Sequence, residues 1–89
     1  MPRISFFYGI TIKMYHNEVH HLGRPHFHAG HGEHEATIDI QTLAIIAGTL
    51  PATAQRLVTE WAQAHQSELL ENWTLARAHQ PLAWIEPLS

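Results

Sequence analysis

The sequence predicts an α+β domain in which an antiparallel sheet of four to five strands, residues 4–47, precedes a helical segment, residues 51–79, packed on one sheet face. Hydrophobic residues recur with period two through the first forty residues and at spacings of three and four in the last forty, and the change falls near Pro51. With 89 residues, 45% of them hydrophobic and 15% charged, we expect a single domain over residues 1–89 with one core.

The first strand region runs from Ile4 to His16, where even-numbered positions are apolar and odd-numbered positions are mixed. The even positions predict the buried face, which comprises Ile4, Phe6, Tyr8, Ile10, Ile12 and Met14. Gly9 interrupts the pattern, so the region is either one long bent strand or two short strands. Residues 17–25 combine turn formers without periodicity and predict a loop.

Residues 26–40 predict a β-hairpin that turns around a central His-Gly-Glu sequence. Its apolar face comprises Phe27, Ala29, Ala36, Ile38 and Ile40. The opposite face, which we expect to be displayed away from the helices, collects His26, His28, Glu35, Thr37 and Asp39. Two registers are compatible with these faces, one with His28 opposite Glu35 and the other with His26 opposite Asp39.

Pro51 suits the first turn of a helix, and neither glycine nor proline follows before residue 80. Because about thirty residues is long for one helix in so small a domain, the polar patch at residues 65–68 predicts a kink or two helices, about 52–65 and 67–79, with Ser67 as N-cap. Large apolar side chains at helical spacing predict core packing against the sheet, with a dimer face as the alternative; they are Leu57, Trp61, Leu69, Leu70 and Trp73.

Two shorter segments flank the helices. Residues 43–48 predict a short fifth strand, with a helical turn as the alternative. The tail, residues 81–88, holds Trp84 and Ile85 between two prolines and predicts an extended segment that packs on the domain.

Charge and composition exclude several functional classes. The formal net charge is −3 and the five Lys and Arg residues are scattered, so we expect no general attraction to DNA, although a specific RNA remains open. The absence of cysteine excludes disulfides and thiol nucleophiles, which favours a cytoplasmic location. No apolar run approaches the ~18 residues of a membrane helix, and the first residues lack a secretion signal.

Nine histidines outnumber Lys and Arg together, and seven of them lie between positions 16 and 34. His26 and His28 alternate along one strand and therefore point to the same side. A carboxylate from Asp39 or Glu35, or the imidazole of His16, would complete a set of ligands that suits Zn, Ni, Fe(II) or Mn. These five residues are the predicted divalent-metal site.

Two alternatives use the same residues differently. In the first, the histidine face is ordinary polar surface of a protein–protein interaction module, whose partner binds the sheet edge or the helices. In the second, His26 and His28 act as acid and base of a small ribonuclease, and Lys13 or Arg24 stabilises the phosphate. Neighbouring His65, Ser67 and Glu68 diverge on helical geometry and predict a helix junction rather than a catalytic triad.

Several segments taken together form a distinctive pattern, namely residues 4–15, 24–29 (RPHFHA), 35–40, 48–51, 60–62, 68–73 (ELLENW) and 85–88. With this pattern the chain resembles, over almost its whole length, the bacterial proteins grouped as domain of unknown function 4160. The resemblance implies a small bacterial cytosolic protein without an assigned reaction, encoded beside another small protein that would be its partner, and suggested as a toxin–antitoxin component. His26, His28, Glu35 and Asp39 fall on matching positions, whereas the histidines at 20, 21, 31 and 34 depart from the pattern.

Overall fold

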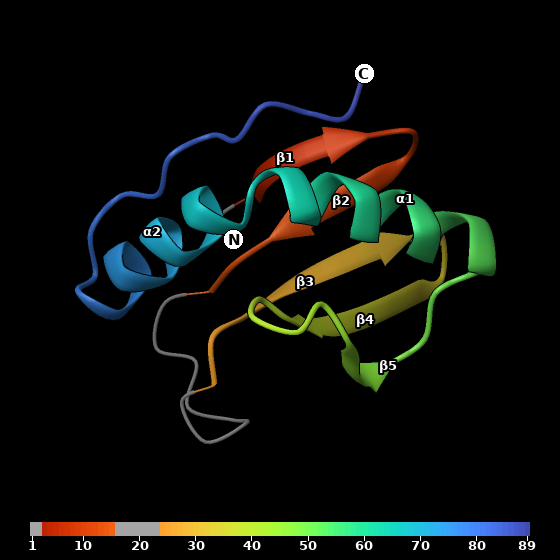
Figure 1. Ribbon diagram of the computed structural model, residues 1–89, viewed down its shortest axis with the longest axis horizontal. Helices are drawn as coiled ribbons and strands as arrows, with labels where there is room; N and C mark the ends of the chain where they lie inside the picture. The colour runs from red at the N-terminus through yellow and green to blue at the C-terminus, as the bar shows by residue number, and fades with distance from the viewer. Residues whose placement is uncertain (1–2, 16–23) are drawn as a thin grey trace.

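A computed structural model describes residues 3–15 and 24–89. It confirms the α+β prediction, with a five-stranded antiparallel sheet followed by two helices. The elements are β1 (Arg3–Phe7), β2 (Ile10–Lys13), β3 (His26–His31), β4 (His34–Asp39), β5 (Ile45–Gly48), α1 (Ala52–Ala64) and α2 (Gln66–Arg77). The strands lie side by side in chain order, and α1 crosses in front of the sheet in Figure 1. No helix within the described ranges is long and apolar enough to cross a membrane.

The first strand region is two strands joined by a tight turn at Tyr8 and Gly9, whose φ angles are 51° and 77°. Positive φ at both turn positions matches the right-handed twist of the flanking strands. The predicted buried face is wrong at Phe6 and Tyr8, which are exposed, while Phe7 is buried. An irregularity in the pairing near the start of β1 shifts the alternation by one residue, so Phe7 faces the core with Ile10 opposite it.

The β3–β4 hairpin confirms the prediction, and its five apolar residues are buried. Of the two registers considered, the structure has the one with His26 opposite Asp39. The opposite face is only partly displayed, which corrects the sequence-based expectation, because His26 is 1% exposed and Asp39 is 2% exposed. This part of the polar face is covered by other parts of the protein. One of them is α2, because the ring centroid of its Trp73 lies 4.9 Å from that of His26.

The helical segment divides into two helices, as predicted, and the junction is His65. The N-cap of α2 is His65 rather than Ser67, and it makes no side-chain cap bond. Instead, its imidazole Nδ1 pairs with the carboxylate of Glu68 in the first turn of α2. A carboxylate at this position also interacts favourably with the positive end of the helix dipole.

The core centres on Trp61 of α1, which is fully buried. The centroid of its ring lies 5.3 Å from that of Phe7 on the edge strand β1 and 6.0 Å from that of Phe27 on the central strand β3. Leu69 and Trp73 of α2 are buried in the same core, whereas Leu70 is exposed. The apolar residues of the helices therefore form core, apart from Leu70, as the sequence predicts.

The C-terminal tail is an extended strap that returns to the domain, as predicted. The Ile85 N–H donates to the Ile4 carbonyl at 2.8 Å, and Ser5 Oγ donates to the Ile85 carbonyl at 3.0 Å. Asn72 on α2 holds the strap at Ala83 through two hydrogen bonds, one from its amide nitrogen and one to its amide oxygen. The strap thus connects the first strand to the last helix.

Candidate functional site

His26 and His28 lie two residues apart on β3, and their rings are near neighbours. The ring centroids are 5.3 Å apart and the ring planes are almost perpendicular. His28 faces Lys13 on β2 and Thr37 on β4 in the sheet register. The structure therefore brings the two predicted histidines together at one end of the central strands.

His26 is held in a defined orientation inside the protein. Its Nδ1 lies 2.7 Å from the carbonyl oxygen of Arg24. Because a carbonyl can only accept a hydrogen bond, Nδ1 carries the proton, and in the neutral ring Nε2 is the nitrogen with the lone pair. The ring also contacts the rings of Trp73 and His28, whose centroids lie 4.9 Å and 5.3 Å from its own.

His28 sits closer to solvent and beside a carboxylate. Its Nδ1 lies 3.2 Å from Thr37 Oγ1 and 3.8 Å from Glu35 Oε2. The His28 side chain is 12% exposed and that of Glu35 is 54% exposed, so the carboxylate can change rotamer without displacing the core. The Tyr15 ring makes an edge contact with the His28 ring, and the two ring centroids are 4.6 Å apart.

Asp39, which the sequence predicts as a metal ligand, has a full set of protein partners. Its Oδ1 accepts hydrogen bonds from the backbone N–H groups of Gln41 at 2.7 Å and Thr42 at 3.0 Å. Its Oδ2 pairs with Arg24 Nε at 2.9 Å. This carboxylate closes the turn after β4 and ties it to the segment that enters β3. The sequence Asp-Ile-Gln-Thr at residues 39–42 carries a signal for this role, because an Asp side chain commonly accepts a hydrogen bond from the backbone N–H two residues further along the chain.

Replacing Asp39 by alanine is expected to destabilise the protein by about 2–3 kcal/mol, because two backbone donors lose a charged acceptor and Arg24 loses its partner. Glu35→Ala is the control, since it removes a carboxylate that is 54% exposed on the same strand, and we expect a loss below about 0.5 kcal/mol. Urea unfolding followed by circular dichroism measures both. Equal losses for the two variants would show that Asp39 does not hold the turn.

The last of the five predicted metal ligands is His16. His16 lies outside the described residues, and so do His20 and His21. Within residues 3–15 and 24–89, no three His, Cys, Asp or Glu side chains are placed to share one metal ion. The described part of the candidate site is thus the His26–His28 pair with Glu35 beside it.

Fold and site define a small α+β protein in which a five-stranded antiparallel sheet, covered by two helices, carries a histidine pair at the end of its central strand. A family model described as domain of unknown function (DUF4160) matches residues 9–74, and the chain belongs to this family. The match includes His26, His28, Glu35 and Asp39 and ends within α2. No curated protein and no solved structure matches the chain.

Proposed function

We propose that this chain is a small accessory or regulatory protein that binds one divalent transition-metal ion through His26 and His28. The observation that carries the proposal is the pairing of their rings at 5.3 Å together with the hydrogen bond from His26 Nδ1 to the Arg24 carbonyl. Metal-bound histidines commonly donate their second ring N–H to a carbonyl or carboxylate, which fixes the ring and raises the basicity of the ligating nitrogen.

A third ligand is needed for a stable site, and Glu35 is the best supported. Its carboxylate already lies beside His28 and is exposed enough to rotate toward the pair. Asp39 would first have to give up its bonds to the backbone and to Arg24. His16 is the alternative from outside the described residues. Two imidazoles and a carboxylate suit Zn, Ni, Fe(II) or Mn.

The burial of His26 favours metal binding over ribonuclease activity. Acid–base cleavage requires that both imidazoles touch the phosphodiester, and His26 is 1% exposed beneath Trp73. A single metal ion is small enough to be enclosed beside a buried ring. Lys13 does lie opposite His28, as the ribonuclease hypothesis requires, but it cannot replace the contact that His26 would have to make.

The biological setting that we propose is the bacterial cytoplasm, where the protein acts with the product of a neighbouring gene, for example in a toxin–antitoxin pair. The support for this part is the family resemblance. A pull-down with the neighbouring gene product, performed with and without a chelator, separates a metal-dependent partner from one that binds the polar surface regardless of metal.

Calorimetric titration with Zn, Ni, Fe(II) and Mn tests the metal site. We expect one ion per chain, and a loss of affinity of about 100-fold or more in His26→Ala/His28→Ala, because two of three ligands are removed. Since His26→Ala opens a cavity beside Trp73, His28→Ala alone serves as a variant that leaves the buried ring in place.

The matched control is His31→Ala/His34→Ala, which removes two histidines that lie opposite each other at the far end of the same hairpin. We expect its affinity to stay within about threefold of the wild type. Equal loss in both double variants would mean adventitious binding to a histidine-rich surface, and would contradict the proposal.

A further inference from the structure

The sheet face turned away from α1 carries an exposed aromatic side chain. Phe7 packs on Trp61 of α1, so its neighbour Phe6 projects from the opposite face, which is turned away from the viewer in Figure 1. Phe6 is 46% exposed there. The irregularity in the β1–β2 pairing between Arg3 and Ser5 produces this orientation, and such irregularities often re-aim a side chain next to a functional site. The ring is therefore accessible to a ligand.

Two cations lie beside this ring. Arg3 and Lys13 are register partners on β1 and β2, and the guanidinium carbon of Arg3 lies 5.8 Å from the centroid of the Phe6 ring. Lys13 lies between two buried residues of β2 and its end, so alternation places it on the Phe6 face. Within residues 3–15 and 24–89 neither cation has an ion-pair partner, whereas Arg24 is held by a carboxylate. The pair is thus available to an anion.

The sheet next to the ring is flat. Phe6 pairs with Thr11 and Thr11 with Gly30, so the row across β1, β2 and β3 presents one small side chain and then none. A Cβ built on Gly30 would meet only the carbonyl oxygen of His34, at 3.8 Å. The next residue of the row is Glu35 on β4, whose carboxylate limits the surface that an anion can occupy. A planar ring in contact with Phe6 therefore has room above β2 and β3.

These features specify a ligand with planar rings and negative charges in alternation. Single-stranded nucleic acid has both, because its unpaired bases stack on aromatic side chains while its phosphates bind Lys and Arg. A duplex keeps the faces of its bases inside the helix. The net charge of −3 does not oppose such binding, because half of the eight acidic residues belong to the helices and the strap; they are Glu60, Glu68, Glu71 and Glu86.

We infer that the sheet face formed by Arg3, Phe6, Thr11 and Lys13 binds single-stranded nucleic acid. One base lies on the Phe6 ring, and the adjacent phosphates bind Arg3 and Lys13. The inference concerns binding without cleavage, so it does not require access to the buried His26. It is also independent of the metal proposal, because none of the four residues is a proposed metal ligand.

Nuclear magnetic resonance titration with octauridylate, at about 50 mM salt and with EDTA to remove any metal, tests the inference. We expect the largest amide shift changes at Phe6, Thr11, Lys13 and Gly30. Phe6→Leu should weaken binding about fivefold or more, whereas Phe6→Tyr, which keeps an aromatic ring, should stay within about twofold of the wild type. Equal affinities of the two variants would overturn the assignment of a base to this ring.

The phosphate contacts are tested by Arg3→Gln/Lys13→Gln. We expect about tenfold weaker binding and a salt dependence whose logarithmic slope is smaller by about 1.4, because each contact to a single strand contributes about 0.7. The matched control is Arg56→Gln/Arg77→Gln, which removes the same charge from exposed positions on α1 and α2. Its affinity should stay within about twofold of the wild type. Equal loss in both double variants would overturn the site in favour of general electrostatic attraction.

Three further observations decide what occupies the face. An abasic octamer, which keeps the phosphates and loses the bases, should bind at least about fivefold more weakly, and equal binding would reduce the site to an anion site. An eight-base-pair RNA duplex should also bind more weakly, and equal binding would overturn the preference for a single strand. Concentration-dependent shifts of the same amides in the protein alone, without shifts on addition of octauridylate, would assign the face to a second copy of the chain and overturn the inference.

Discussion

Trp61→Ala is expected to remove most of the stability of the protein. The side chain is fully buried between Phe7 and Phe27, and its indole N–H donates to the Glu86 carbonyl at 2.8 Å. Truncation of a buried tryptophan costs about 3–5 kcal/mol, against a total of about 5–10 kcal/mol for a domain of this size. The strap also loses a bond that holds Glu86 to α1. Thermal unfolding should shift down by roughly 15 °C or more.

Trp84→Ala is the matched control for Trp61. It deletes the same side chain at a position that is 57% exposed on the strap, so we expect a change within about 0.5 kcal/mol. The two variants are compared by thermal unfolding under one set of conditions. A loss for Trp61→Ala as small as that for Trp84→Ala would show that the helices do not pack on the sheet as described.

Gly48→Ala is expected to detach β5 from the sheet. Gly48 has a φ of +77°, and a Cβ built there would lie 2.1 Å from the Glu35 carbonyl oxygen and 3.0 Å from the Ala36 Cα. Both obstacles are backbone atoms of β4, so no side-chain rotation relieves the contact. The β4–β5 pairing must open, at a cost of about 3 kcal/mol or more, which exceeds the roughly 1–2 kcal/mol of the positive φ alone.

Gly32→Ala separates the steric contribution from the conformational one. Gly32 has a φ of +60°, but a Cβ there would meet no atom within 4 Å. We expect a loss of about 1 kcal/mol. Urea unfolding gives the two free energies, and hydrogen exchange of the Ile45–Gly48 amides reports detachment of β5. Similar losses in both variants, with β5 still protected, would contradict the close approach of Gly48 to β4.

The fold was largely predictable because local patterns dominate its parts. Period-two alternation predicts the hairpin faces of residues 26–40, and the polar patch near His65 predicts the division of the helical segment. The phase of β1 was not predictable, since one irregularity near its start exchanges Phe6 and Phe7 between faces. The N-cap of α2 is likewise His65 rather than the predicted Ser67, and the His65 side chain pairs with Glu68.

The candidate site was predictable only in part, because alternation assigns a residue to a sheet face without showing what covers that face. The sequence predicts that His26 and His28 share a side, and the structure has their rings adjacent. The sequence does not show that Trp73, which is far along the chain, packs on His26. Nor does it show that Asp39 is bound by the turn that follows it. Both contacts arise from tertiary structure.

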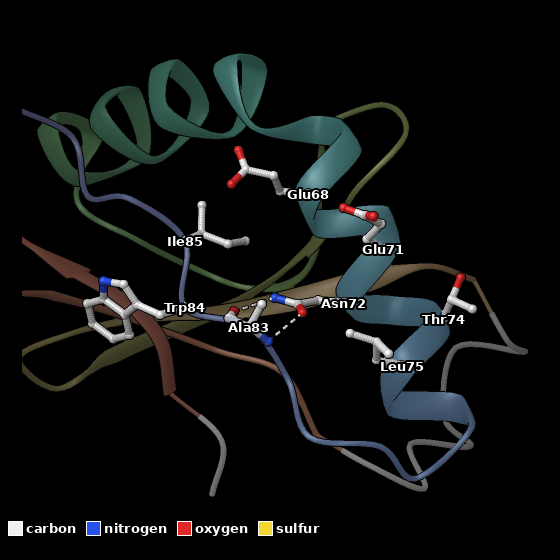
Figure 2. Close-up of a pocket in the computed structure, with 8 residues that line it drawn as sticks. All are labelled: Glu68, Glu71, Asn72, Thr74, Leu75, Ala83, Trp84 and Ile85. Atoms are coloured by element: carbon white, nitrogen blue, oxygen red, sulfur yellow. Dashed lines mark hydrogen bonds between the residues drawn. The ribbon is translucent and has the colours of Figure 1, made fainter.

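The attachment of the strap to α2 depends on a tertiary contact as well. Asn72 belongs to the ELLENW segment that carries much of the family resemblance, and its bonds to Ala83 fix the strap against the helix. In the sequence these residues are eleven apart and read only as helix and tail. Their pairing holds the strap along α2, as Figure 2 shows.

Anomalous diffraction from a crystal of the protein grown with one equivalent of zinc tests the metal site most directly. The proposal predicts one zinc ion bonded to a ring nitrogen of both His26 and His28, at about 2.0–2.1 Å, with Glu35, Asp39 or His16 as a further ligand. Zinc bound instead at His31, His34 or His65, with the His26–His28 pair left without metal, would contradict it.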